Sequence, residues 1–149
     1  MPHILIIDAP YYEHISQQLL EGAVEVLDRE GATHERISVP GVLEIPAALS
    51  MALEAQAING DRFDGYITLG CVIRGETTHY DVVAGESARA LMDLSVDEAL
   101  ALGNGIQTVE NEAQAIARAS KSDKNKGGGA AQAALDMIKL RDQLVAHGA

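Results

Sequence analysis

The segment richest in reactive side chains is GCVIRGETTHYD, residues 70–81, in which polar residues follow directly on an apolar run. Gly75 allows a tight turn after that run, and Thr77 or Thr78 can cap the helix that follows. The free backbone N–H groups and the positive dipole end of such a helix favour an anion. The segment therefore predicts a binding site for a phosphate or a carboxylate.

His79 falls in the first turn of this expected helix, among other polar residues. The positive potential there disfavours the imidazolium form, which keeps a neutral imidazole available as a general base. The alternative is a histidine that is hydrogen-bonded at a helix start and has no catalytic role. The other histidines suggest no function, because they lie at strand, helix or tail positions and lack metal-ligand spacing: His3, His14, His34 and His147.

Two cations stand out in the polar region near residue 120. Arg118 ends an expected helix, and Lys126 precedes a run of three glycines, Gly127 to Gly129. A glycine-rich helix start can hold a phosphate, but these glycines match neither the dinucleotide-binding fingerprint nor the P-loop. The alternative is a solvated loop in which basic residues are favoured near a helix C-terminus. The residues alone support either interpretation.

A carboxylate lies in the segment VPGVLEIP, residues 39–46. Pro40 and Gly41 turn the chain there, so we expect Glu44 to face the same rim as the other loops. At that rim it can accept hydrogen bonds from hydroxyl or amine groups of a ligand. Alternatively, Glu44 complements the dipole of the helix that follows it, a role that needs no ligand.

The segment PYY, residues 10–12, holds two of the four tyrosines in the chain. A tyrosine at the end of a strand can stack on a planar ring of a ligand, and Tyr11 is placed for this. It can equally be a packing residue at a turn.

Apolar, β-branched runs alternate with stretches of helical periodicity along the chain. The runs predict strands over 3–9, 34–39, 64–73 and 105–109. The periodicity predicts helices from residue 15 up to Gly31, over 44–58, after residue 79, over 110–119 and from about 128 to 146. This alternation is typical of a parallel sheet covered on both faces, a three-layer α/β/α sandwich with four strands. Ligands of such sheets bind beyond the carboxyl ends of the strands, where we expect the loops 9–13, 40–45, 71–79 and 109–112.

The expected helix over 44–58 is apolar on nearly all sides, since Ser50, Glu54 and Gln56 are its only polar residues after Ile45. Such a helix needs cover on more than one side, which predicts a subunit interface. The alternative is an alanine-rich helix that packs only on its own sheet.

The acidic balance of the chain excludes one class of partner. The sequence has 22 Asp and Glu residues against 11 Lys and Arg, a formal charge of −11. Nonspecific attraction to nucleic acid or to an anionic membrane is therefore not expected. An anionic ligand has to be bound by individual cations.

Length and cysteine usage limit the architecture further. The 149 residues predict one domain, 1–149, with one core large enough to need no disulfide or metal. The lone Cys71 is expected to be a small buried side chain in a reducing compartment, the alternative being a reactive thiol. The N-terminus has no basic leader, and no apolar stretch is long enough to span a membrane. We expect a soluble, cytoplasmic protein.

Four segments together resemble one enzyme family: VPGVLEIP, GCVIRGETTHYD, GNGIQTVEN and NKGG occur in this order. Over about residues 4–140 the chain resembles lumazine synthases, and TLGCVIRGETTHYD is the most specific segment. The resemblance implies a flavodoxin-like sandwich and a transferase of riboflavin biosynthesis. The implied reaction condenses 5-amino-6-ribitylaminouracil with 3,4-dihydroxy-2-butanone 4-phosphate to 6,7-dimethyl-8-ribityllumazine, phosphate and water. It implies no metal and no organic cofactor.

The resemblance also assigns roles to residues. His79 matches the proton-transfer histidine, and Arg118 matches the arginine that binds phosphate, with Thr77 and the backbone of Glu76 beside it. The positions that match contacts to the pyrimidine and the ribityl chain are Tyr11, Val42, Glu44, Ile45, Val72, Ile73 and Lys126. Most such sites join two subunits, and Arg118 and Lys126 would then come from the neighbour.

Three positions in the implied substrate site depart from the family pattern. Tyr11 replaces the more common Phe and should stack as well. Leu43 stands where many members carry an aromatic residue, and Asn104 stands where they carry Phe. The departures bear on pocket shape and flavin affinity, so a flavin-binding protein without turnover is the alternative function.

The resemblance implies a homo-oligomer, since lumazine synthases assemble as pentamers or as icosahedral shells of 60 subunits. We expect the pentamer, because little chain precedes the first strand to pair with a neighbouring sheet. A structural shell protein is the further alternative. Riboflavin synthase is a candidate partner.

Overall fold

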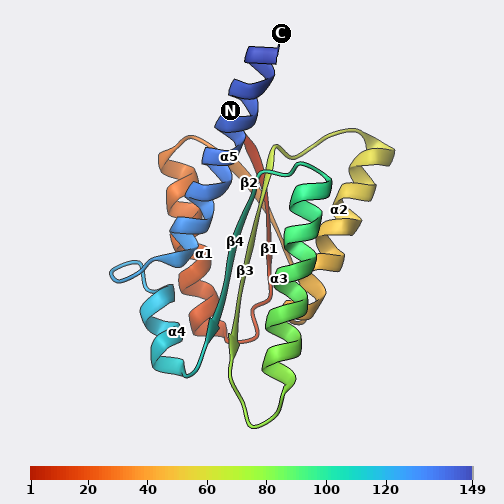
Figure 1. Ribbon diagram of the computed structural model, residues 1–149. Helices are drawn as coiled ribbons and strands as arrows, with labels where there is room; N and C mark the ends of the chain where they lie inside the picture. The colour runs from red at the N-terminus through yellow and green to blue at the C-terminus, as the bar shows by residue number, and fades with distance from the viewer. Residues whose placement is uncertain (149) are drawn as a thin grey trace.

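A computed structural model of the chain describes residues 1–148 and contains one four-stranded sheet. All strand pairs are parallel and the strand order is β2-β1-β3-β4. The bounds are β1 (His3–Asp8), β2 (Thr33–Ser38), β3 (Gly65–Ile73) and β4 (Leu102–Val109). Figure 1 shows the sheet between two layers of helices.

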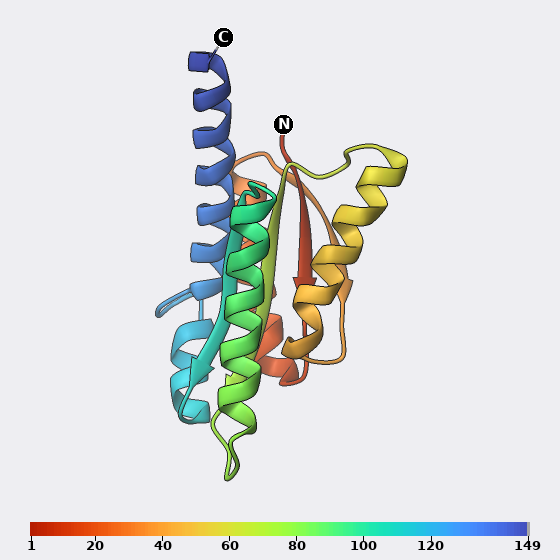
Figure 2. The same ribbon diagram turned by 45° about the vertical axis from the view of Figure 1, so that its right-hand side comes forward.

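The helices confirm the predicted three-layer sandwich. They are α1 (Glu13–Arg29), α2 (Ile45–Asn59), α3 (His79–Asp97), α4 (Glu112–Ala119) and α5 (Lys126–Gly148), with a 3₁₀ turn, η1 (Val42–Glu44), before α2. In Figures 1 and 2, α1, α4 and α5 cover one face of the sheet, and α2 and α3 cover the other. The order 2-1-3-4 is that of flavodoxin-like sheets.

Side-chain type explains the place of each strand in the sheet. In β3 every residue from Gly65 to Val72 is buried, as expected for a central parallel strand covered on both faces. In β2 no residue is buried, and the segment THERIS is mostly polar. Its outer edge pairs with no other strand in the part of the chain that the structure describes.

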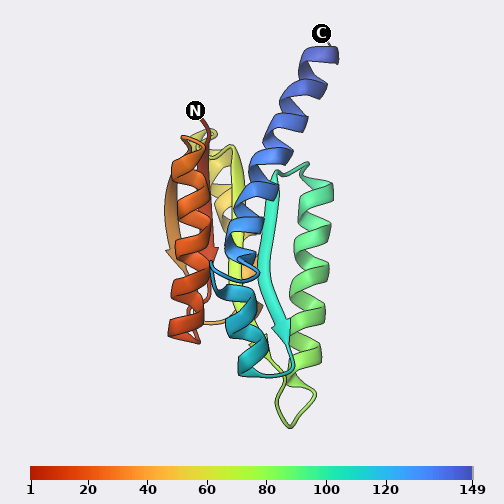
Figure 3. The same cartoon turned by 90° about the vertical axis from the view of Figure 1, so that its left-hand side faces the viewer.

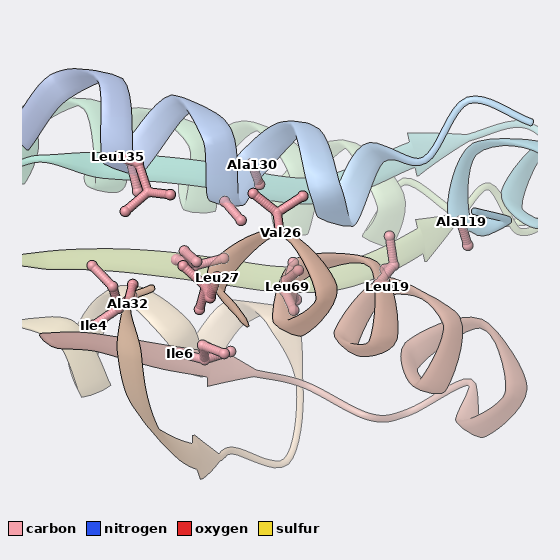
Figure 4. Packing of buried hydrophobic residues seen from close by; sticks show 14 of the residues in the cluster. Ile4, Ile6, Leu19, Val26, Leu27, Ala32, Leu69, Ala119, Ala130 and Leu135 are labelled. Atoms are coloured by element: carbon pink, nitrogen blue, oxygen red, sulfur yellow. The ribbon is translucent and has the colours of Figure 1, made fainter. Parts of the chain in front are cut away.

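The face that carries α1 and α5 is packed through glycines. A Cβ atom on Gly103 of β4 would lie 1.8 Å from the carbonyl oxygen of Ala130 in α5. A Cβ atom on Gly127 would lie 2.0 Å from the carbonyl oxygen of Leu19 in α1. The helices therefore approach the strand and each other at backbone distance. Figure 4 shows the apolar cluster beneath them, which includes Leu19, Leu69 and Leu135.

Two predicted boundaries were wrong because of these glycines. The fourth strand begins at Leu102 and not at 105, since Leu102 pairs with Tyr66 and residues 103 and 104 continue the register. The last helix begins at Lys126 and not near 128, so Gly127 and the next two glycines form its first turn. Glycine has a weak intrinsic preference for either element, and packing overrides that preference here.

A smaller correction concerns the fourth helix, which was predicted over 110–119 and begins at Glu112. The side chain of Asn111 accepts a hydrogen bond from the backbone N–H of Gln114 at 2.9 Å. This is an N-cap interaction, and it places the helix start directly after Asn111.

On the opposite face, α2 and α3 bury few residues. In α3 the buried positions are Val83, Ser87 and Leu91, which recur at helical spacing. In α2 only Ile45 and Leu49 are buried. Met51 and Ile58 of α2 are 68% and 75% exposed, which is the exposure that the predicted interface requires.

The C-terminal half of α5 extends past the end of the sheet, as Figure 3 shows from the side. Its outward side chains include Leu144 and Val145, both exposed. None of the helices described over residues 1–148 is long and apolar enough to cross a membrane.

Candidate active site

A pocket of about 410 Å³ opens at the carboxyl ends of the strands. The loops that follow β1, β2 and β3 line it, so it lies at the point where strand order reverses between β1 and β3. This is the usual ligand site of open α/β sheets. The predicted site residues that line it are Tyr11, Val42, Leu43, Glu44, Val72, Ile73, Thr77 and His79.

The floor of the pocket is apolar. Val42, Val72 and Val83 belong to the buried cluster beneath α2 and α3, and they line the pocket together with Cys71. Burial raises the pKa of the Cys71 thiol to about 11. The thiol therefore stays protonated near neutral pH, which disfavours the alternative of a reactive thiol.

One wall carries the aromatic residues. Tyr11 is 71% exposed, and its ring meets that of Tyr12 edge to face with centroids 5.0 Å apart. A side chain so exposed at the pocket mouth is free to stack on a planar ligand. Tyr12 also lines the pocket, and burial, followed by the nearby Cys71 and Tyr11, raises the pKa of its phenol. The segment PYY was the only sequence signal for this second tyrosine.

His79, the first residue of α3, also lines the pocket. The Thr77 hydroxyl accepts a hydrogen bond from the backbone N–H of His79 at 3.2 Å, whereas the side chain of Thr78, the N-cap residue, makes no capping hydrogen bond. The His79 side chain is exposed and lines the pocket. It therefore lies at a helix N-terminus on the pocket rim, and its role as a base stays a prediction.

Glu44 ends the 3₁₀ turn and is exposed on the rim. Within residues 1–148 its carboxylate makes no hydrogen bond or ion pair, so both oxygens are available to ligand donors. Ile45, the next residue, is fully buried and lies under the pocket rather than in its lining. Its Cδ1 would be 3.7 Å from a Cβ atom on Gly70 of β3.

Five predicted site residues do not line the pocket of this chain: Ile45, Glu76, Asn104, Arg118 and Lys126. Glu76 lies in the exposed loop between β3 and α3. Arg118 is in α4 and donates a hydrogen bond to the carbonyl oxygen of Gln114 at 3.2 Å. Lys126 is exposed at the start of α5. These two cations lie on elements of the opposite face, so their supply by a neighbouring subunit stays a prediction.

Asn104 has a structural role that the sequence did not reveal. It lies within β4, where its Oδ1 accepts hydrogen bonds at 3.0 Å from the Thr68 hydroxyl and from the backbone N–H of Ile106. Its side chain is nevertheless exposed. That Asn104 contacts substrate stays a prediction.

Arg74 and Tyr80 were not assigned a role from the sequence, and the structure brings them together. The guanidinium carbon of Arg74 lies 4.2 Å from the centroid of the Tyr80 ring. Arg74 Nε donates to Glu110 at 2.8 Å, and Nη1 lies 3.6 Å from Asp81. Tyr80 lines the pocket beside His79. Sequence could not pair residues 74 and 110, which only the fold makes neighbours.

The described residues offer no metal site, since no three His, Cys, Asp or Glu side chains within 1–148 are grouped to hold an ion. The expectation that the protein works without metal or organic cofactor stays a prediction.

Comparison with known proteins identifies a family. The profile of 6,7-dimethyl-8-ribityllumazine synthase matches residues 2–142. The chain is 56% identical over 143 residues to the 6,7-dimethyl-8-ribityllumazine synthase of Agrobacterium fabrum, covering 96% of this chain and 97% of the relative. It is 56% identical over 145 residues to 6,7-dimethyl-8-ribityllumazine synthase 1 of Rhizobium meliloti, covering 97% and 95%. The Bartonella tribocorum relative of the same name is 57% identical over 140 residues, covering 94% and 90%.

Proposed function

Because the chain belongs to the 6,7-dimethyl-8-ribityllumazine synthase family, we propose that the pocket described above is the site where it forms this product. The protein is an enzyme of the transferase class and makes 6,7-dimethyl-8-ribityllumazine in riboflavin biosynthesis. Its substrates are 5-amino-6-ribitylaminouracil and 3,4-dihydroxy-2-butanone 4-phosphate. Phosphate and water leave.

The single observation that carries the site assignment is the position of His79. It lies at the N-terminus of α3, on the rim of a pocket at the carboxyl ends of the strands. In the same pocket, Tyr11 offers an aromatic face and Glu44 offers an unpaired carboxylate. A pyrimidine with a polyol chain and a phosphorylated ketone together need these three functions: stacking, hydrogen-bond acceptance and proton transfer.

The proposed reaction starts when the 5-amino group attacks the ketone carbonyl and water leaves, forming an imine. Phosphate is then eliminated, and ring closure with loss of a second water completes the product. His79 carries protons between these steps. General acid–base catalysis contributes about 10²- to 10⁴-fold, and we expect the lower end because an amine and a ketone condense readily. Holding the two substrates in register contributes at least as much.

The remaining residues bind substrate in this proposal. Tyr11 stacks on the pyrimidine, and Val72 and Ile73 lie beside the ring. Glu44 accepts hydrogen bonds from the ribityl hydroxyls, for which its free carboxylate is suited. The other proposed contacts to the pyrimidine and the ribityl chain are Val42, Leu43, Ile45, Asn104 and Lys126. The phosphate lies at Thr77, the backbone of Glu76 and Arg118.

We propose that the active form is a homo-oligomer in which Arg118 and Lys126 of one subunit complete the pocket of the next. Two observations support this. In one chain both cations lie outside the pocket lining, and α2 exposes Met51 and Ile58. A pentamer is the favoured assembly, an icosahedral shell is the larger alternative, and riboflavin synthase remains a candidate partner.

Two further parts of the proposal concern the chain as a whole. We propose that residues 1–149 form one domain, which is supported by a single sheet with helices on both faces. We propose a cytoplasmic location, which is supported by a lone, buried, free cysteine.

An absorbance assay with both substrates tests the function. The wild-type protein should form the lumazine, whereas a flavin-binding protein without turnover would leave the substrates unchanged.

His79→Ala should lower kcat about 100-fold with little change in substrate binding. Arg118→Ala should raise KM for the phosphorylated ketone, and an unchanged KM would remove Arg118 from the phosphate site. Arg89→Ala is the control, because within residues 1–148 the ion pairs of exposed Arg89 are with Glu86 and Asp93 of its own helix, α3. Light scattering on the same samples distinguishes a pentamer from a shell.

A further inference from the structure

Arg74 joins three elements at the carboxyl end of the sheet. It follows directly on β3, and its backbone N–H donates to the carbonyl oxygen of Val109, the last residue of β4, at 2.9 Å. Its Nε donates to Glu110 at 2.8 Å, just beyond β4. Its guanidinium also faces Asp81 and the ring of Tyr80, both in the first turn of α3.

The loop that Arg74 begins is otherwise poorly attached. In Figures 1 and 3 the segment between β3 and α3 extends beyond every other element at that end of the molecule. The hydrogen bonds of Thr77 and Thr78 reach only the first turn of α3. The Thr77 hydroxyl accepts from the His79 N–H at 3.2 Å, and the Thr78 carbonyl oxygen accepts from the Asp81 N–H at 3.0 Å. The guanidinium of Arg74 therefore connects this turn to the end of β4 through side-chain contacts.

We infer that Arg74 is a positioning residue for His79. This inference rests on the proposed function, in which His79 transfers protons. Arg74 contacts the two residues that directly follow His79, and one of them, Tyr80, lines the same pocket. By anchoring that turn to Glu110, it fixes where the imidazole lies relative to the bound substrates. A misplacement of about 1 Å at a reacting group can reduce a rate about 100-fold.

Stability alone does not account for this arrangement. The guanidinium and both carboxylates are exposed, and isolated exposed ion pairs contribute little to folding. The planar guanidinium of Arg74 pairs with one carboxylate, faces a second and stacks on a ring. These three contacts together restrict the orientation of the first turn of α3, and lysine cannot reproduce all of them. We infer that this network controls the position of His79 in the site.

The test compares Arg74→Ala and Arg74→Lys with Arg89→Ala, the substitution of an exposed arginine that pairs with two carboxylates on the same helix. We expect Arg74→Ala to lower kcat about tenfold or more. KM for the phosphorylated ketone should change less than about twofold, and Arg74→Lys should recover only part of the rate. Arg89→Ala should match the wild-type protein. A wild-type kcat in Arg74→Ala, or a loss confined to KM, overturns the inference.

A double-mutant cycle separates positioning from an independent effect. If Arg74 acts through His79, Arg74→Ala should cost little further activity once His79 is alanine. Equal losses in both backgrounds overturn the inference. If Arg74→Ala folds poorly, Glu110→Gln removes the 2.8 Å ion pair from outside α3 and is measured by the same cycle. An inactive wild-type protein would instead contradict the proposed function.

Discussion

The two faces of the sheet are packed in different ways. On one face, glycines at 103 and 127 bring α5 to backbone distance from β4 and α1, over a continuous apolar cluster. On the other, α2 and α3 bury only a few side chains each and leave Met51 and Ile58 exposed. The pocket opens beside the first turns of this second pair of helices.

The difference shows how one small sheet can serve two purposes. The closely packed face is held by contacts within one chain, so it can keep the strands in register without a partner. The other face holds its helices less tightly, which leaves room for a pocket at their N-termini and an apolar surface for a neighbouring subunit. Substitutions in the core of the first face should therefore affect folding, and those on the outer side of α2 or at the pocket rim should affect assembly or catalysis.

Gly103→Ala should have the largest effect on stability. The added methyl group would meet the carbonyl of Ala130, which belongs to a helix backbone and cannot rotate away. We expect the free energy of unfolding to fall by about 3 kcal/mol or more, measured by urea denaturation. The matched control on the other face is Gly85→Ala, since nothing lies within 4 Å of a Cβ atom at Gly85 in α3. It should stabilise the chain by about 0.5–1 kcal/mol. Similar effects at both glycines would contradict the difference between the faces.

Asp8→Ala should have the next largest effect. Asp8 is 1% exposed at the end of β1, where its carboxylate accepts from Arg36 Nε at 2.9 Å and from the Ser38 hydroxyl at 2.5 Å. The variant leaves Arg36 without its partner and loosens the edge strand β2. Because Arg36 is partly exposed, we expect a loss of about 2 kcal/mol, less than for a fully buried pair.

Urea denaturation also measures this change, and Glu25→Ala is its control. Glu25 pairs with Lys121 at 2.8 Å on the surface. Hydrogen bonding to Lys121 lowers the pKa of Glu25, yet both groups are exposed, so its loss should leave the denaturation midpoint unchanged. An equally stable Asp8→Ala would show that the buried carboxylate does not hold β2.

Met51→Glu should have the smallest effect on the folded chain. The Met51 side chain is 68% exposed, so the free energy of unfolding should change by less than about 0.5 kcal/mol. A charge on this apolar surface should instead reduce the oligomer mass seen by light scattering. Gln17→Glu, which adds the same charge at an exposed position of α1, should leave the mass unchanged. If Met51→Glu assembles normally, the outer side of α2 is not an interface.

Local patterns predicted much of this molecule. The apolar run of β3 and the helical spacing of α1 and α3 were sufficient to place those elements, because their side chains all serve one core. The start of β4 was not predictable, since Gly103 and Asn104 have weak strand preference and are held by contacts to α5 and Thr68. His79 and Glu44 could be predicted as pocket residues because polar residues that follow parallel strands gather at the carboxyl edge of the sheet.

The rest of the site depends on contacts between residues distant in sequence. Arg74 faces Glu110 only because β3 and β4 are neighbours in the sheet. No periodicity within either segment reports that pairing. For Arg118 and Lys126, it was the family resemblance and not a local pattern that predicted a place outside the pocket of their own chain, and neither residue lines that pocket.

The polar character of β2 has a consequence for the behaviour of the protein at high concentration. An unpaired strand edge is a template on which other chains can add strands, the first step towards fibrils. In β2 the charged residues Glu35 and Arg36 lie on that edge strand, and Glu35 also pairs with His3 and Arg62. An incoming strand would have to desolvate or disrupt these charges. The margin of the sheet is therefore a poor seed for aggregation, even though the strands within it are among the most apolar segments of the chain.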